Sequence, residues 1–389
     1  MRVLLAGAAL QERWVGGEPE VARLLGIGLR REGHEVIRVA QAREGAALAS
    51  MALVPLDYDP VSEKRYFQVL RETRPDVVLA FYDYDTSLVR SCRRAGLPVI
   101  VCAHIFWPTC PIGVMYIDGQ GTCDGAGFAK CLRHTMVSVP DSRLPIPFRE
   151  LPFPAAMQVY LKFLTRAKNL RTANAIVVPS ESMRDLLQTQ GLGGIQVIPN
   201  AVDANQFKPR AESSGIRRVL FPAGSTSERK GFSHFVRLAQ KLKRTFPTVE
   251  FTATNYVGDE SITRSSYLSR ADYVRLLQDS TIVVVPPLWP EPFGMVALEA
   301  MAAGRPVVAY RSGALPEIVV DGESGIIADV GDVRTLTDGV QTLLEDESMC
   351  DSMGRAGRRR AENEFNLEQM TQRYLSLIGS VTNSTRSSE

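Results

Sequence analysis

The sequence lacks three features that would place it in a simple class. Lysine and arginine number 45 and aspartate and glutamate 43 among 389 residues, so the formal net charge of +2 does not support binding of nucleic acid through a large basic surface. No apolar run approaches the roughly 20 residues of a membrane-spanning helix. The chain has only six cysteines, irregularly spaced, four of them between residues 92 and 123. This argues against a secreted disulfide framework, and we expect a cytoplasmic protein.

What is present indicates an α/β protein. Hydrophobic residues make up 45% of the chain, which is long enough for two domains. Short apolar runs alternate with amphipathic stretches in both halves, which predicts doubly wound parallel sheets whose ligands bind beyond the carboxyl ends of the strands. We expect strands at residues 3–6, 35–39, 77–81, 99–103, 175–178, 219–221, 249–254, 282–285 and 307–309.

One stretch organises the second half. Ile282 to Val285 predicts a buried strand, Phe293 to Ala303 a helix that Gly304 ends, and Val307 to Ala309 a second buried strand. The loop between the first strand and the helix is expected to carry the chemistry.

Two carboxylates, Glu291 and Glu299, bracket this loop and helix. Eight helical steps would separate them by about 12 Å and about 80°, whereas a glycosidase pair lies about 5 to 9.5 Å apart. The spacing favours two carboxylates that bind an extended ligand at two separate points. The N–H groups at the start of the helix have no intrahelical partners and can bind an anion. The alternative is two solvated surface charges.

The segments Glu291-Pro292-Phe293-Gly294 and Glu299-Ala300-Met301-Ala302, with Gly304 and Pro306 beyond, resemble the signature of glycosyltransferase family 4. That resemblance implies the GT-B fold: two doubly wound, Rossmann-like domains facing a central cleft. It also implies a retaining transferase whose donor is a nucleoside diphosphate sugar, with a UDP-sugar the first choice. Glu299 would hold the ribose hydroxyls and Glu291 the donor sugar, helped by the helix start at Phe293, Gly294, Met295 and Val296.

The domain boundary follows from a second resemblance. Pro199-Asn200-Ala201-Val202-Asp203 is similar to the Pro-Asn-Gly-Val-Asp link of the family. We therefore expect an acceptor-binding domain over residues 1–199 and a nucleotide-sugar domain over 200–364. A last helix, 365–379, would cross back to the first domain, and residues 380–389 would form a disordered tail.

A phosphate-binding loop is expected at residues 223–231, between a strand and a helix. It is not a P-loop, because its second glycine follows the lysine. The family has Gly-Arg here and a later Lys-Gly, and the arginine and lysine hold the pyrophosphate. Gly224 and Lys230 match, but Ser225 replaces the arginine. Arg229 could substitute for it or could be solvated.

In the first domain, Gly16 and Gly17 allow close approach of a ligand to the backbone, as the glycine pair of the family does, or form a plain flexible loop. His104 stands at the end of a predicted strand. The family has a histidine at the matching place, beside the donor sugar, so the resemblance implies a sugar contact; a packed core histidine is the alternative.

Residues 105–153 interrupt the alternation and form a long ordered loop or a small insert. Within it, Cys110, Cys123, Cys131 and His134 have the residue types of a closed tetrahedral zinc site, and Cys131 and His134 form a short chelating Cys-x-x-His pair. Some relatives carry a similar insert that ends in Cys-x-x-Cys. We expect a structural zinc with no catalytic role; buried free cysteines and a chance disulfide are the alternatives.

The helical stretch 155–171 has apolar residues and the basic residues Lys162, Arg166, Lys168 and Arg171. It reads either as a crossover helix with solvated charges, the preferred interpretation, or as a basic face that lies on the inner surface of a membrane.

The predicted function is transfer of a sugar to a hydroxyl of a glycan, lipid-linked or small-molecule acceptor with retention. Lys230 and Arg229 would stabilise the leaving pyrophosphate and His104 would contact the sugar, with no cofactor needed for catalysis. Two rivals stay open: a sugar-nucleotide epimerase of the same fold, and a non-catalytic sugar-nucleotide sensor.

Overall fold

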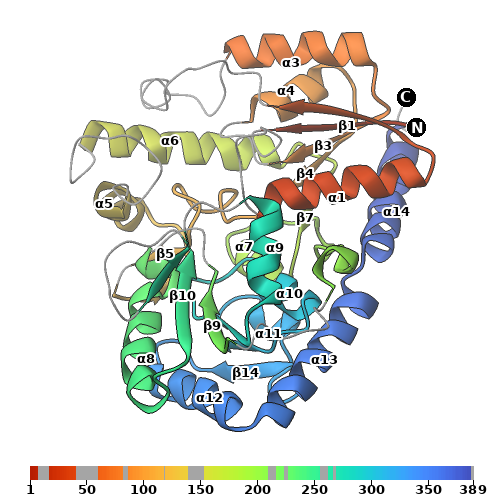
Figure 1. Ribbon diagram of the computed structural model, residues 1–389. Coiled ribbons are helices and arrows are strands. Elements are labelled where there is room, and N and C mark those ends of the chain that lie inside the picture. The colour runs from red at the N-terminus through yellow and green to blue at the C-terminus, as the bar shows by residue number, and fades with distance from the viewer. Residues whose placement is uncertain are drawn as a thin grey trace. The chain divides into compact units, whose positions relative to one another are not determined.

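The computed structural model describes residues 1–7, 17–40, 60–81, 86–117, 119–138, 153–208, 216–222, 227–254, 262–265 and 269–386. The chain divides into two compact units, Met1–Pro199 together with Met370–Glu389, and Asn200–Gln369. Figure 1 shows their elements.

The first unit is built on six parallel strands in the order β2-β1-β3-β4-β7-β8. Helices cover both faces, so the four central strands β1, β3, β4 and β7 are buried and read as apolar runs, whereas the edge strands β2 and β8 carry exposed polar residues. The strands are β1 (Arg2–Gly7), β2 (Glu35–Ala40), β3 (Val77–Phe81), β4 (Val99–Cys102), β7 (Ala175–Val178) and β8 (Ile195–Val197), and a small antiparallel hairpin pairs β5 (Tyr116–Ile117) with β6 (Gly121–Thr122).

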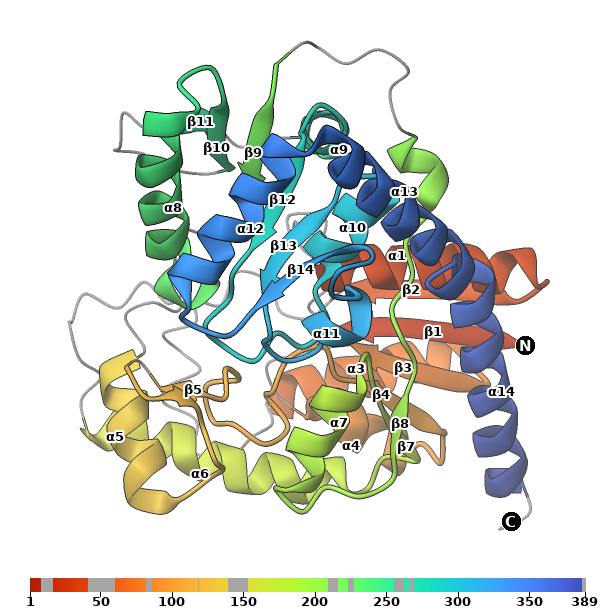
Figure 2. The same cartoon turned by 90° about the horizontal axis from the view of Figure 1, so that it is seen from below.

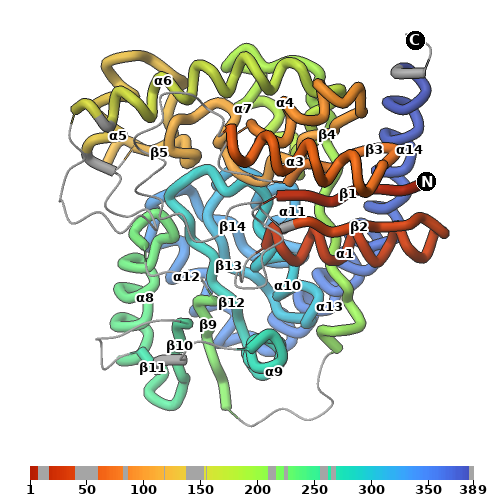
Figure 3. The backbone as a smooth tube through the Cα atoms, turned by 90° about the horizontal axis from the view of Figure 1, so that it is seen from above, coloured from red at the N-terminus to blue at the C-terminus, as the bar shows by residue number. Residues whose placement is uncertain are grey.

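On one face of this sheet, buried side chains of α3, α4 and α7 pack against alternate strand residues such as Val78 and Val101. On the other face lie α1 and the last helix α14, which are neighbours in Figure 3. A Cβ on Gly28 would meet Oγ1 of Thr371, and the Tyr374 hydroxyl lies 3.8 Å from Sγ of Cys102. The helices are α1 (Gly17–Arg31), α3 (Pro60–Thr73), α4 (Ser87–Arg94), α5 (Phe128–Ser138), α6 (Phe153–Leu170), α7 (Glu181–Gln188) and α14 (Leu367–Arg386).

The second unit also has six parallel strands, in the order β11-β10-β9-β12-β13-β14. In Figure 2, α8 and α12 lie on one side of this sheet and α9, α10 and α13 on the other, which matches two separate apolar clusters. The elements are β9 (Arg218–Phe221), β10 (Glu250–Thr254), β11 (Thr263–Ser265), β12 (Ile282–Val285), β13 (Val307–Tyr310), β14 (Gly325–Ala328), α8 (Phe232–Thr245), α9 (Arg270–Gln278), α10 (Met295–Ala302), α11 (Leu315–Ile318), α12 (Val333–Glu345), α13 (Glu347–Glu364) and the 3-10 turns η3 (Ala204–Phe207) and η4 (Glu228–Lys230).

The predicted fold class of two doubly wound parallel-sheet domains is confirmed. The prediction of a disordered tail from Ser380 is wrong as far as Arg386, because α14 continues to that residue. Ile378 and Val381 extend its buried face, and the Thr382 hydroxyl bonds back to the carbonyl of Ile378. No helix in the described parts of the chain is long and apolar enough to cross a membrane.

Candidate active site

The second sheet has a switch point between β9 and β12. From β9 the chain moves outward through β10 and β11, and it then returns to the opposite side of β9 to form β12. Ligands of doubly wound sheets bind beyond the carboxyl ends of the strands at such a reversal. The segments that follow these two strands, Ser227–Gly231 and Pro286–Gly294, contain Lys230 and Glu291.

Lys230 and Glu291 form a pair that Trp289 holds in place. Nζ of Lys230 lies 2.9 Å from Oε2 of Glu291, and the indole N–H of Trp289 donates to the same oxygen at 2.9 Å. The ammonium also lies over the Trp289 ring, 4.5 Å from its centroid, a cation–π contact. The Lys230 side chain is 33% exposed. The cation is therefore oriented by two protein groups and still reachable from solvent.

Backbone contacts lock the two segments together. The Leu288 N–H donates to the carbonyl of Arg229 at 2.8 Å. Gly231 has φ +75°, and a Cβ there would lie 1.9 Å from the carbonyl oxygen of Pro286. Gly313, after β13, has φ +55° and would place a Cβ 2.2 Å from the carbonyl oxygen of Glu291. Only glycine fits at these two positions, so the loops behind Lys230 and Glu291 pack backbone against backbone.

Glu299 lies on α10 and is held by two donors from α9. Nη1 of Arg270 lies 2.7 Å from Oε1, and the Tyr273 hydroxyl donates to Oε2 at 2.8 Å. Burial, and then the charge of Glu299, raise the pKa of Tyr273 well above its usual range, so the phenol keeps its proton and donates. Each carboxylate oxygen has a second lone pair, which leaves Glu299 able to accept from a ligand hydroxyl.

The alternative of two solvated charges is wrong for both carboxylates. The side chain of Glu291 is 14% exposed and that of Glu299 7%, and each contacts cationic and neutral donors. The spacing estimate for an unbroken helix does not apply, because α10 begins only at Met295.

The start of α10 supplies backbone donors rather than side chains. Gly294 caps the helix with φ +100°, and the first amides of a helix have no intrahelical partners. The ring of Phe293 is buried and packs 6.0 Å from Phe365, so its side chain belongs to the core. Met295 and Val296 are half-buried beside it.

In the first unit, His104 follows β4. Its Nδ1 lies 3.7 Å from Oε1 of Glu18, its ring stacks on Phe81 with centroids 5.7 Å apart, and its side chain is 7% exposed. Glu18 comes from the first turn of α1, which begins at Gly17. The contacts of His104 are compatible both with a sugar contact and with a core histidine.

Three predicted residues, Gly16, Gly224 and Ser225, lie outside the described residues. Arg229 is half-buried in η4, and its carbonyl accepts the hydrogen bond from the Leu288 N–H that links the two loops. Its substitution for the missing arginine stays a prediction.

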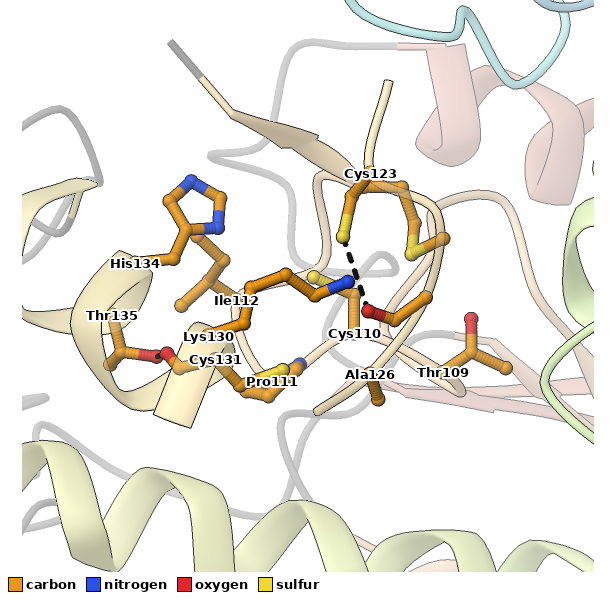
Figure 4. A pocket seen from close by; sticks show the side chains of 12 residues that line it. Thr109, Cys110, Pro111, Ile112, Cys123, Ala126, Lys130, Cys131, His134 and Thr135 are labelled. Carbon is orange, nitrogen blue, oxygen red and sulfur yellow. Dashed lines mark hydrogen bonds between the residues drawn. The ribbon is translucent and has the colours of Figure 1, made fainter. Parts of the chain in front are cut away.

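The four residues of the predicted zinc site line one small cavity in the first unit (Figure 4). All three of their thiols are free, so the chance disulfide is not formed. Within the described ranges, however, no group of three or more His, Cys, Asp or Glu side chains is arranged to hold a metal ion as it stands.

Comparisons with known proteins agree with this architecture. A family model described as Glycosyltransferase Family 4 matches residues 15–206, and one described as Glycosyl transferases group 1 matches residues 248–360. The chain is 30% identical over 215 residues to a glycogen synthase of Mycobacterium tuberculosis and 32% identical over 212 residues to the MMP α-(1→4)-mannosyltransferase of Mycolicibacterium hassiacum. Each match covers 50% of this chain and 51% of the relative, so the chain spans about half the length of these curated relatives.

Two solved structures share the fold over almost their whole length. Sucrose-phosphate synthase from Thermosynechococcus elongatus has a TM-score of 0.70 at 17% identity, covering 98% of this chain and 99% of that one. The Anabaena protein HepE, in complex with UDP and glucose, has a TM-score of 0.66 at 16% identity, covering 98% and 100%. The two doubly wound units and the switch-point site place the chain in the GT-B class. The chain belongs to glycosyltransferase family 4.

Three of the groups that orient these carboxylates were not predicted. Trp289 lies two residues before Glu291, inside the loop that the sequence singled out, and its indole N–H was an available donor signal. Arg270 and Tyr273 precede Glu299 by 29 and 26 residues and reach it only through the packing of α9 on α10. No local pattern connects them to it.

Proposed function

We propose that the chain is a retaining glycosyltransferase that moves a sugar from a nucleoside diphosphate sugar to an acceptor hydroxyl. The observation that carries this proposal is the site at the switch point of the second sheet. There the solvent-reachable cation of Lys230 pairs with Glu291, and Glu299, the second carboxylate of the family signature, is oriented by Arg270 and Tyr273. Two comparisons support it. The structural neighbour HepE was solved in complex with UDP and glucose, and the curated relatives are named as a glycogen synthase and a mannosyltransferase.

Donor binding would use Glu299 and the start of α10. Glu299 is fixed by Arg270 and Tyr273 and would accept from the two ribose hydroxyls, with little loss of side-chain entropy because it is already held. The free amides of the first turn of α10 would face negatively charged or hydroxyl oxygens of the donor. Glu291, oriented by Trp289, would accept from hydroxyls of the sugar.

In the reaction the bond between the anomeric carbon and the phosphate oxygen breaks, and its electron pair leaves with the nucleoside diphosphate. A bond forms from the acceptor oxygen to the same face of that carbon, and the proton of the acceptor hydroxyl passes to the departing phosphate oxygen. Negative charge therefore grows on the diphosphate in the transition state. The ammonium of Lys230 would stabilise that charge without reorganisation, because Glu291 and Trp289 already hold it.

The first test is a thermal-shift panel of nucleoside diphosphate sugars at saturating concentration, since a ligand that binds only the folded state raises the melting temperature. The best donor is then incubated alone. Slow hydrolysis with water as acceptor, accelerated as transfer when an acceptor is added, supports the proposal. Epimerisation of the donor alone would indicate the epimerase, and binding without hydrolysis or transfer would indicate the sensor.

We further propose that an anionic membrane surface is a partner of the first unit. Phe128 on α5 and Phe153, Leu161 and Leu164 on α6 are large hydrophobic residues with exposures of 44 to 53%. Neither helix contains an aspartate or glutamate, and the exposed Lys168 follows Leu161 and Leu164 on the same side of α6, so this face is apolar and basic.

The prediction that Arg166 belongs to this basic face is wrong. Arg166 points inward: Nη1 donates to the carbonyl of Trp107 at 2.8 Å, and the guanidinium lies 5.7 Å from the Trp107 ring centroid. Of the other predicted basic residues, Lys168 and Arg171 are exposed and Lys162 is half-buried.

A further inference from the structure

Three cysteines from separate segments converge on one cavity of the first unit. Cys110 ends a turn after β4, Cys123 follows the β5–β6 hairpin, and Cys131 lies in the first turn of α5. Their residues are 6, 8 and 7% exposed, and none of the thiols is in a disulfide. In Figure 4 their sulfur atoms face the same cavity, whose volume of about 10 Å³ holds roughly one water-sized sphere.

Backbone hydrogen bonds fix each cysteine where it stands. The Cys110 N–H donates to the carbonyl of Phe106 at 2.8 Å, the Cys123 N–H to that of Met115 at 2.8 Å, and the Cys131 N–H to that of Gly127 at 2.7 Å. The convergence therefore does not depend on rotatable side chains alone. A disulfide could use only two of the three thiols and would leave one over.

A backbone hydrogen bond holds the Cys131 sulfur at the start of α5. The Gly127 N–H donates to Sγ of Cys131 at 3.4 Å. Lys130 lines the same cavity and pairs with Asp124. Three thiolates and one divalent cation would together carry a net charge of −1. The ammonium of Lys130 would lie close to that negative charge.

A histidine of the same helix also lines the cavity. His134 follows Cys131 by three residues, so both side chains lie on one face of α5, and both line the cavity. In the present arrangement the Cys123 thiol donates to the carbonyl of Gly125 at 3.4 Å. Closing a tetrahedral shell requires loss of that proton and a rearrangement of the four side chains, which do not surround a metal position as they stand.

We propose that Cys110, Cys123, Cys131 and His134 bind one structural zinc ion that cross-links the insert. Three sulfurs and one imidazole nitrogen match the ligand set and number of a closed tetrahedral zinc site. With all four positions filled by protein, the metal would take no part in sugar transfer, and the proposal is independent of the proposed function.

The test is elemental analysis of protein purified without chelator. We expect about one zinc per chain in the wild type, and the same in the matched control Cys350→Ser, which alters a buried cysteine of the second unit. Cys131→Ser should lose most of the metal and melt at a lower temperature, as should wild type after chelator treatment. A wild type without metal, or a Cys131→Ser variant with full zinc content, would overturn the proposal.

A second variant keeps the test decisive if Cys131→Ser does not fold. His134→Cys should retain one zinc, because a fourth thiolate completes the same shell, and its cobalt-substituted form should show the absorption of tetrahedral thiolate coordination. A cobalt form of wild type and of His134→Cys without thiolate-to-metal absorption would contradict the assignment.

Discussion

Trp289 donates its indole N–H to the carboxylate oxygen of Glu291 that also contacts Lys230, and the two distances are equal at 2.9 Å. The same indole ring lies under the ammonium. One aromatic side chain thus orients both members of the cation–carboxylate pair.

Trp289 is therefore predicted to position the catalytic pair. Trp289→Phe keeps a ring under Lys230 but removes the donor to Glu291. Since a hydrogen bond to a charged group contributes about 1.5 to 3 kcal/mol, we expect kcat/KM to fall by about 10- to 100-fold. Steady-state kinetics measure kcat/KM of the variant, and a melting curve shows whether the variant is folded. Wild-type kinetics in a folded variant would show that the indole N–H does not matter.

Lys230→Ala and Glu299→Ala are predicted to differ in kind. In the proposed function Lys230 stabilises charge that grows in the transition state, so its loss should lower kcat, by about 100-fold. In the proposed function Glu299 binds the ribose before the reaction, so its loss should raise the KM of the donor while kcat changes little. If both variants changed only KM, Lys230 would not stabilise the leaving group.

Arg229 is predicted to replace the arginine that the family has at the position of Ser225. Arg229→Ala should then lower kcat by about 10-fold or more, because one cationic donor to the pyrophosphate is lost. Lys241→Ala, which removes an exposed cation of α8 that pairs with Asp338 at the surface, is the matched control. Activity of the Arg229 variant within about threefold of wild type would leave the replacement unsupported.

The α5–α6 face is predicted to bind anionic vesicles. Leu161→Glu with Leu164→Glu should weaken co-sedimentation with vesicles that contain phosphatidylglycerol by about 10-fold or more, because two apolar contacts become charges of the same sign as the lipid. Val61→Glu, at a 74% exposed position of α3, is the control and should bind as wild type does. Equal binding by all three proteins, or no binding by wild type, would count against a membrane partner.

The fold was predictable where burial decides the pattern. Strands β3 and β12 have the predicted bounds because a parallel strand covered on both faces reads as an unbroken apolar run. Strands β11 and β14 were not predicted: β11 is a polar three-residue edge strand, and β14 begins with a glycine. Helix α10 begins two residues later than predicted, because Gly294 adopts a left-handed conformation before it.

The site was predictable only as far as local sequence reaches. Glu291, Glu299 and Lys230 were predicted from local motifs that resemble those of the family, although Ser225 departs from the pattern around Lys230. The groups that orient them come partly from elsewhere, since Tyr273 and Arg270 reach Glu299 from α9 and Glu18 reaches His104 from α1. These relationships arise from packing between helices and strands distant in the chain, which periodicity and spacing do not encode.

The measurement that tests the central claim most directly is a proton NMR time course of donor and acceptor with the wild-type protein. The anomeric coupling identifies the configuration of the donor and of the first product formed. The proposed function predicts loss of the donor signal, release of the nucleoside diphosphate, and a product whose configuration is that of the donor, with the rate strongly reduced in Lys230→Ala. A product of inverted configuration, or a donor that binds and is never cleaved, would contradict it.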